Sequence, residues 1–367
     1  MRTLLLGASG TLGRRVAGDL ARAAPVTELV LAARREHRLA EVAALLGGAQ
    51  VRSVDVADPV SLKAALDGVE LVVNCAGPGY LTEEAAARAC AAAGLSYLSV
   101  NADHEPVASV LALQGLARER GAVLVTGIGA APGISNLLAA LALDALDEPR
   151  ELELGLAGSS ADGGGEATLL HLLRELSAPA PVLADGRVIT EAAGEAPRLV
   201  YFPEPVGWVE TFRCGRPEVL TLPRRFPALE AAEARLGLTE RATMDVLRAA
   251  AFTGMLRIER GRRTLLKLGA RLRPLLEKMP PRGAPWTGIR VDVHGLDRGR
   301  PATVTYAIVD RLANMARLPL LLAVQALARG DIAPGVLSPE AVFEPKAFFR
   351  ALAAHGLRAA RLEPEPV

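Results

Sequence analysis

The chain opens on Met1-Arg-Thr-Leu-Leu-Leu-Gly7-Ala-Ser-Gly10-Thr-Leu-Gly13-Arg-Arg-Val, an apolar strand followed by three glycines spaced three residues apart. In a dinucleotide-binding turn, the first glycine permits a tight bend. The second lets the backbone approach a pyrophosphate, and the third lets the following helix pack against the strand. The free N–H groups at the start of that helix then face the phosphates. A plain strand-to-helix turn is the alternative. We predict a cofactor loop made of Gly7, Ser9, Gly10, Thr11, Leu12 and Gly13.

Composition and charge restrict the class of protein. A length of 367 residues suggests two domains, and a hydrophobic fraction of 50% supports a large core. The net charge is +1, with acids and bases interspersed, so nothing indicates a nucleic-acid partner or an anionic membrane surface. Three cysteines (Cys75, Cys90 and Cys214) lack metal-ligand spacing and leave one thiol unpaired. This fits a reducing cytoplasm, and we predict no metal site.

The apolar segments are short. The N-terminal run breaks into glycines too early for a signal peptide. The longest mostly apolar stretch, Leu318–Ala328, falls well below the roughly 20 residues that a membrane span needs. We therefore expect a cytoplasmic protein without a membrane span.

The first 130 residues alternate short apolar strands with helices. This alternation is typical of parallel strands in a doubly wound α/β sheet. We predict a Rossmann domain over residues 1–130. Its six strands are expected at residues 3–6, 28–32, 51–54, 71–74, 97–100 and 123–126.

Beyond residue 130 the strands become longer and alternate apolar with polar residues, as at 151–156, 289–294 and 303–309. We predict a second α+β domain over 131–309 with a mostly antiparallel sheet. Residues 310–367 are predicted to be helices that return to the Rossmann domain. Helices are expected between the strands of the second domain at 167–176, 228–236, 239–252 and 264–276.

The end of the second strand usually determines which nucleotide is bound. An acid there serves the ribose hydroxyls of NAD, whereas an arginine suits a 2′-phosphate. Here the strand ends Leu31-Ala-Ala-Arg34-Arg35, with no acid before Glu36. A guanidinium can bind a phosphate bidentately. We predict NADP (NADPH) as cofactor, bound by Arg34 and Arg35; two solvated surface arginines are the alternative.

Two further strand ends complete the predicted cofactor site. Asp55 and Val56 follow the third strand, where Asp55 serves either the adenine side or an ordinary turn. Asn74-Cys-Ala76-Gly77-Pro78 follows the fourth strand. Its small residues let the backbone pass beside the ribose or nicotinamide, in keeping with ligands at the carboxyl ends of parallel strands. A structural turn is the alternative there.

Polar residues crowd the end of the fifth strand, in Tyr97-Leu-Ser99-Val-Asn101-Ala-Asp103-His104-Glu105. We predict that Tyr97, Asn101 and Asp103 form the catalytic group, with Asp103 as the proton-transfer candidate. The alternative is that Asp103 only caps the next helix. The expected site is a cleft between the domains, lined by these residues, by Gly77-Pro78 and by the loop Gly129–Asn136. The helix that starts there favours an anionic substrate group such as a carboxylate.

These pieces together resemble the saccharopine-dehydrogenase-like oxidoreductases. The resemblance implies an NADP-type Rossmann domain and a substrate domain whose sheet also forms a homodimer. It also implies hydride transfer to or from a C=N (or C=C) bond of a small amino-acid-like substrate. The matching segments are Gly7-x-x-Gly10-x-x-Gly13, Ala33-Arg34-Arg35, Asp55-Val56, Asn74-x-Ala76-Gly77-Pro78, the Tyr97 strand, Gly129-x-x-Pro132-Gly133-x-Ser135-Asn136, Gly335-Val-Leu-Ser-Pro339-Glu340, Phe348-Phe349 and Gly356.

The chain departs from this family at the fifth strand. The family often reads Tyr-x-Asp-x-Ser/Thr-x-Glu, where this chain has Tyr97-Leu-Ser99-Val-Asn101-Ala-Asp103. Ser99 therefore holds the first acid position, and the second acid is shortened to Asp103. The substrate-binding arginines of saccharopine enzymes have no clear counterpart. The resemblance thus implies the reaction class and leaves the substrate open.

Two alternative functions are considered. A short-chain dehydrogenase needs Tyr-x-x-x-Lys, and no tyrosine of this chain has a lysine four residues later. A non-catalytic NADP-binding regulator stays open, because the family's acids are altered. The four tyrosines, Tyr80, Tyr97, Tyr201 and Tyr306, are followed at that spacing by Glu84, Asn101, Pro205 and Asp310.

Overall fold

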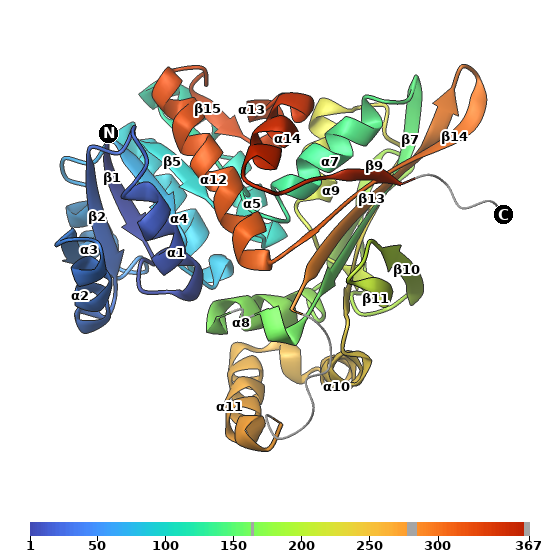
Figure 1. The fold of residues 1–367 in the computed structure, drawn as a ribbon, viewed down its shortest axis with the longest axis horizontal. Coiled ribbons are helices and arrows are strands. Elements are labelled where there is room, and N and C mark those ends of the chain that lie inside the picture. The colour runs from blue at the N-terminus through green and yellow to red at the C-terminus, as the bar shows by residue number, and fades with distance from the viewer. Residues whose placement is uncertain (163–164, 277–284, 363–367) are drawn as a thin grey trace. The chain divides into compact units, whose positions relative to one another are not determined.

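The computed structural model describes residues 1–162, 165–276 and 285–362, which divide into two compact units (Figure 1). The first unit comprises Met1–Ile134 and Ala313–Glu344. The second comprises Ser135–Leu312 and Pro345–Val367. Within the described ranges, no helix is long and apolar enough to span a membrane.

The first unit is built on a seven-stranded sheet in the order β15-β6-β5-β4-β1-β2-β3, and every ladder in it is parallel. This confirms the predicted doubly wound sheet. The strands are β1 (Arg2–Leu6), β2 (Glu28–Ala33), β3 (Gln50–Ser53), β4 (Leu71–Asn74), β5 (Ser96–Ser99), β6 (Val123–Val125) and β15 (Gly335–Leu337). The helices are α1 (Thr11–Leu20), α2 (Glu36–Leu45), α3 (Pro59–Ala65), α4 (Gly79–Ala93), α5 (His104–Leu111), α6 (Gln114–Arg120), α12 (Leu312–Arg329) and α13 (Pro339–Val342).

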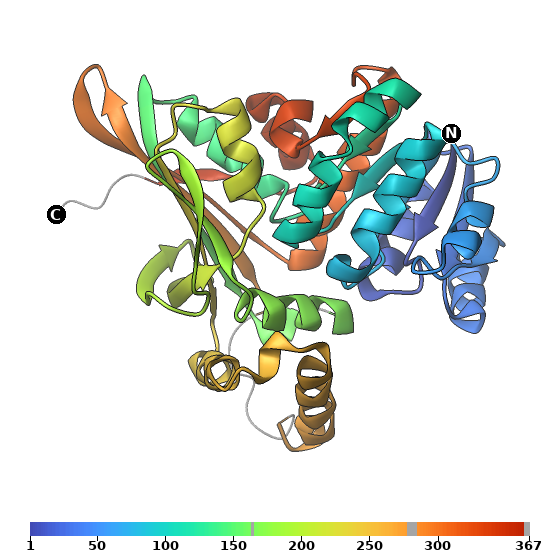
Figure 2. The ribbon, with the colours of Figure 1, turned by 180° about the vertical axis from the view of Figure 1, so that it is seen from behind.

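Helices cover both faces of this sheet, because both faces of its strands are apolar. Successive side chains of a strand point to opposite faces. Leu4 and Leu6 of β1 accordingly join a core with α3, α4 and α6, whereas Leu5 joins a separate core with α1, α2 and α12. Figure 1 shows α1 and α12 on one side, and Figure 2 shows the α4–α6 segment on the other. Such a sheet exposes its polar groups mainly at the strand ends.

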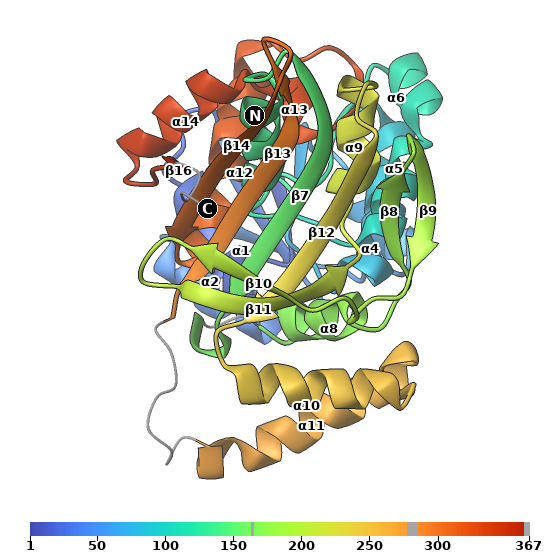
Figure 3. The ribbon, with the colours of Figure 1, turned by 90° about the vertical axis from the view of Figure 1, so that its right-hand side faces the viewer.

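The second unit carries a nine-stranded sheet with the main order β10-β11-β12-β7-β13-β14-β16 (Figure 3). Among the ladders of the described residues only β12–β7 is parallel, so the predicted mostly antiparallel sheet is confirmed. The strands are β7 (Glu148–Gly158), β8 (Ala180–Ala184), β9 (Arg187–Glu191), β10 (Arg198–Phe202), β11 (Gly207–Cys214), β12 (Ala231–Leu238), β13 (Thr287–Asp297), β14 (Arg300–Asp310) and β16 (Ala360–Leu362). The helices are α7 (Ile134–Leu143), α8 (Glu166–Glu175), α9 (Glu218–Arg225), α10 (Arg241–Phe252), α11 (Glu259–Leu276) and α14 (Pro345–Ala354), with 3₁₀ turns at Ser160–Asp162 and Met255–Arg257.

One predicted helix of the second unit is wrong. Residues 228–236 are rich in Ala, Glu and Leu, which favour a helix. The structure instead has β12 here, paired with β11 on one side and β7 on the other. Ala232, Ala234 and Leu236 alternate into the buried side, so sheet packing overrides the intrinsic preference.

The C-terminal segment contributes to both units, whereas we expected it to return to the first alone. β15 extends the first sheet by pairing with β6. β16 pairs with β14 in the second sheet. The residues from Pro345 onward accordingly belong to the second unit.

Candidate functional site

The glycine-rich turn between β1 and α1 is tightly packed. Gly7 has a φ of +78°, which favours glycine, and a Cβ there would lie 2.5 Å from the amide nitrogen of Ala76. A Cβ on Gly13 would lie 2.1 Å from the carbonyl oxygen of Gly7. Gly10 and Thr11 are exposed, and α1 begins without a side-chain cap. The turn thus has the close packing and the open helix N-terminus that a pyrophosphate site requires.

The segment after β4 lies directly against this turn. Leu6 of β1 pairs with Asn74 of β4, and the Cys75 N–H donates to the Leu6 carbonyl at 2.9 Å. The Asn74 side chain accepts a hydrogen bond from the Ala76 N–H at 2.9 Å, which fixes the start of the segment. Gly77 is exposed, and Pro78 is buried where α4 begins. The structure therefore brings together two of the predicted cofactor segments.

Two unpaired guanidiniums follow β2. Arg34 and Arg35 are exposed, and within the described residues neither guanidinium makes a hydrogen bond or an ion pair. They follow β2, which pairs with β1. At this strand end the Gly7 N–H donates to the Ala32 carbonyl at 2.8 Å. Arg14, by contrast, is held by the Ser9 carbonyl and by Glu41 at 3.1–3.2 Å. The end of β2 therefore presents positive charge beside the glycine-rich turn.

The segment after β3 is engaged in local structure. Asp55 accepts a hydrogen bond from the Ala57 N–H at 3.0 Å, which closes a turn, and its own N–H donates to Ser61. Val56 is 7% exposed and belongs to the core of the first unit. The Asp55 carboxylate thus makes the turn that the sequence left open. Cofactor contacts by these two residues stay a prediction.

Asp103 caps a helix other than the expected one. It occupies the N-cap position of α5, but its side chain makes no capping bond there. Its Oδ2 instead accepts from the Tyr80 N–H, in the first turn of α4, at 3.0 Å. Asn101 accepts from the Asp103 N–H at 3.2 Å. A Cβ on Gly79 would lie 1.7 Å from the Asn101 Oδ1, so only glycine leaves room for this arrangement.

Tyr97 lies deeper than the other predicted catalytic residues. It is 0% exposed, and its hydroxyl donates to Glu83 and accepts from the Asn74 amide, each at 2.8 Å. Burial, followed by the charge of Glu83, raises the pKa of Tyr97 well above its ordinary value. Asn101 and Asp103, at 7% and 5% exposed, lie nearer the surface. The structure thus places Tyr97 beneath the polar residues that it was predicted to join.

Sequence reasoning missed Glu83. This residue lies in the second turn of α4 and is 0% exposed. The sequence did offer one indication of its burial. Glu83 lies at helical spacing from Ala86, Ala87 and Cys90, which form the buried apolar face of α4. Glu84 follows it directly and is exposed. With two acids in succession, the sequence did not show which of them is buried.

The second unit accounts for the last two residues of the loop Gly129–Asn136. Ser135 and Asn136 are both 0% exposed. The Ser135 hydroxyl donates to Glu218 at 2.6 Å, and the Asn136 amide donates to Thr221 at 3.0 Å. These bonds tie α7 to α9. Among the described residues, no group of three or more His, Cys, Asp or Glu side chains is arranged to hold a metal ion.

Comparison with known sequences identifies the N-terminal domain. Residues 3–125 match the family described as saccharopine dehydrogenase NADP binding domain. A protein of Arabidopsis thaliana, named as a probable mitochondrial saccharopine dehydrogenase-like oxidoreductase, is 26% identical over 140 residues. That match covers 34% of this chain and 31% of the plant protein, so it spans less than a third of that relative's length.

Solved structures extend the likeness in fold to the whole chain. An apo saccharopine dehydrogenase (L-Glu forming) from Saccharomyces cerevisiae has a TM-score of 0.71 at 16% identity, covering 99% of this chain and 100% of that one. An amine dehydrogenase from Mycobacterium smegmatis has a TM-score of 0.52 at 13% identity, covering 94% and 98%. At such identities the likeness concerns the fold alone. The sequence match therefore concerns the saccharopine dehydrogenase NADP binding domain at residues 3–125, and the likeness over the rest of the chain is one of fold.

Proposed function

We propose that this protein is an NADP-dependent oxidoreductase that transfers a hydride to or from a C=N (or C=C) bond of a small amino-acid-like substrate. The observation that carries the proposal is the contact between the Gly7 turn and the Cys75–Ala76 backbone. These segments follow β1 and β4, neighbouring strands from which the sheet order runs outward in both directions. Ligands of doubly wound sheets bind at this switch point, outside the carboxyl ends of the strands.

The preference for NADP over NAD rests on Arg34 and Arg35. Both guanidiniums lack a protein partner among the described residues, and no acid precedes Glu36 at this strand end. An exposed, unpaired arginine can take a 2′-phosphate without first breaking an ion pair. NAD-binding proteins use an acidic side chain at this strand end to bind the ribose hydroxyls, and this strand end carries arginines in its place.

For proton transfer we propose Asp103, with Asn101 holding its backbone. A carboxylate is suited to general acid–base work at a reacting amine or imine. Tyr97, enclosed in the core, is better suited to supporting the strand ends than to meeting a substrate. The amine chemistry itself rests on the family and on the names of the two similar enzymes. A carboxylate-bearing substrate and a homodimer formed through the second sheet are further parts of this proposal.

The test is a binding titration followed by a substrate screen. NADPH should bind the purified chain and be oxidised in the presence of one of a panel of imines, 2-oxo acids with amines, and enoyl compounds. Failure to bind NADPH or NADH would refute the proposal. Binding without turnover on any compound would favour the non-catalytic regulator instead.

A further inference from the structure

The carboxyl group of Glu83 gathers four hydrogen-bond donors inside the first unit. Its Oε2 accepts from the Ser99 hydroxyl at 2.5 Å, the Tyr97 hydroxyl at 2.8 Å and the Asn74 amide at 3.2 Å. Its Oε1 accepts from the Thr126 hydroxyl at 2.9 Å. Among the described residues no cation pairs with it.

Three of these donors stand at the ends of three adjacent strands. Asn74 is the last residue of β4, Ser99 is the last residue of β5, and Thr126 directly follows β6. These strands are parallel neighbours, so their carboxyl ends lie side by side. One side chain of α4 therefore fastens three strand ends at the edge where the proposed cofactor binds.

The same donors also hold the segments that follow the strands. Asn74 accepts from the Ala76 N–H at 2.9 Å, so its side chain joins the carboxyl to the backbone beside Gly7. Ser99 accepts from the Asn101 N–H at 3.0 Å, and Asn101 in turn accepts from the Asp103 N–H. Two short chains of hydrogen bonds thus run from Glu83 to the two segments that flank the nicotinamide side of the predicted site.

A carboxyl at this position calls for an explanation beyond packing. Burying an ionisable group without a cation is unfavourable, and an apolar side chain would continue the stripe of Ala86, Ala87 and Cys90 on α4. An apolar side chain, however, could not accept from three strand ends at once. The arrangement favours a role in fixing geometry.

We propose that Glu83 is a positioning residue for the nicotinamide half of the cofactor. It holds the ends of β4, β5 and β6 so that the Ala76 backbone and the Asn101–Asp103 segment face the bound dinucleotide. This inference rests on the proposed function. Arg34, which we assign to the 2′-phosphate of the adenine half, makes no hydrogen bond or ion pair with this network among the described residues, so binding of that half should not depend on Glu83.

The test compares the two halves of the cofactor. In Glu83→Gln, the side chain keeps its shape, but its NH₂ group must donate where the carboxylate accepted. NADPH affinity should fall about tenfold, the scale of one hydrogen bond to a charged group. Affinity for adenosine 2′,5′-bisphosphate, which carries only the adenine half, should stay within about twofold of wild type. Glu84→Gln, the same change one residue along α4 at an exposed position, is the matched control and should change neither affinity.

A second variant covers the case in which Glu83→Gln fails to fold. Ser99→Ala keeps the carboxyl and removes its link to Asn101, so NADPH affinity should fall about threefold with the bisphosphate unaffected. Equal losses for both ligands would indicate general damage and overturn a positioning role. So would NADPH affinities within about twofold of wild type in both variants. A wild-type chain that binds no NADPH would instead refute the proposed function on which the inference rests.

Discussion

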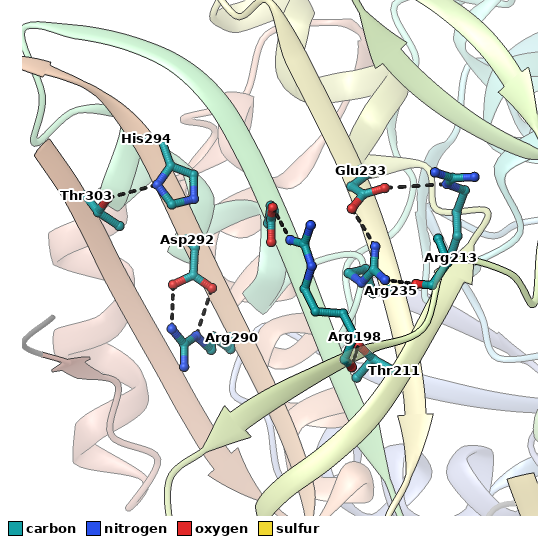
Figure 4. A network of polar contacts seen from close by, with 11 residues as sticks. Arg198, Thr211, Arg213, Glu233, Arg235, Arg290, Asp292, His294 and Thr303 are labelled. Atoms are coloured by element: carbon teal, nitrogen blue, oxygen red, sulfur yellow. Dashed lines mark hydrogen bonds and ion pairs between the residues drawn. The ribbon is translucent and has the colours of Figure 1, made fainter. Parts of the chain in front are cut away.

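The two sheets place their polar side chains differently. In the first sheet both faces are apolar, and the polar groups collect at the carboxyl ends of the strands. In the second, one face carries ion pairs and polar side chains along the strands, next to a small apolar cluster around Phe202. On β13, Arg290, Asp292 and His294 share that face, while Ile289, Val291 and Val293 are buried on the other (Figure 4).

The partners of these polar groups differ as well. On the second sheet the charges neutralise one another, as in the two-pronged contact of Arg290 with Asp292 at 2.8 Å and the contact of Arg213 with Glu233 at 3.4 Å. At the edge of the first sheet, Arg34 and Arg35 have no partner among the described residues. Ion pairs on a sheet face suit solvent or a second copy of the chain. Unpaired cations beside a glycine-rich turn suit a phosphate.

The largest expected effect tests the strand-end site of the first unit. Asp103→Asn should lower turnover by roughly 10²–10⁴-fold if the carboxylate transfers a proton. Asparagine can still accept from the Tyr80 N–H, so the thermal unfolding temperature should stay close to that of wild type. Steady-state rates and thermal melts of the two proteins measure these effects separately. Turnover within about threefold of wild type would leave Asp103 as a cap of α4 only.

Arg34→Ala tests the unpaired cations. NADPH affinity should fall by roughly 1.5–3 kcal/mol, because a charge-assisted contact to the 2′-phosphate is lost. NADH affinity should stay almost unchanged, since NADH lacks that phosphate. Calorimetric titration with both nucleotides gives the difference directly. Equal wild-type affinities for NADPH and NADH would contradict the assignment.

Arg290→Ala tests the paired charges of the second sheet and serves as the counterpart of Arg34→Ala. Removing this arginine takes away the bidentate partner of the Asp292 carboxylate. It also removes the hydrogen-bond donor to the Tyr201 carbonyl. We expect the free energy of unfolding to fall by about 1–2 kcal/mol with NADPH affinity unchanged. Denaturant unfolding and the same titration are the measurements. A loss of NADPH affinity equal to that of Arg34→Ala would remove the distinction between the two sheets.

The difference between the sheets also explains what could be predicted from the sequence. Strands that are buried on both faces appear in the sequence as short apolar segments followed by glycine and polar residues, so they are easy to recognise. Strands β1 to β6 of the first sheet and its glycine-rich turn were therefore predicted in order, whereas β15, which comes from the C-terminal segment, was not. The second sheet depends on pairing between distant segments, which local sequence does not reveal. The residues of β12 were therefore predicted as a helix, and β8 to β11 were not predicted. Tyr97 was placed in the site because only its neighbours in sequence were known. Its partner Glu83 comes from another element, which spacing alone does not reveal.

The smallest effect that we predict concerns the pH dependence contributed by Glu83. Burial raises the pKa of this carboxyl above its ordinary value, and the hydrogen bonds from Ser99, Tyr97, Thr126 and Asn74 only partly oppose the rise. A carboxyl whose pKa is higher in the folded state contributes its full stability below the unfolded pKa of about 4. It loses that contribution as the pH rises through the folded pKa.

Glutamine does not titrate, so the free energy of unfolding of wild type minus that of Glu83→Gln should fall as the pH is raised from about 4 to 8. Groups common to both proteins cancel in this difference. The neighbouring Tyr97 and Cys90 stay neutral over the range, because burial raises the pKa of each. Urea unfolding of both proteins across this range measures the difference. A difference that grows with pH would mean that the four donors outweigh burial and hold Glu83 as a stable carboxylate.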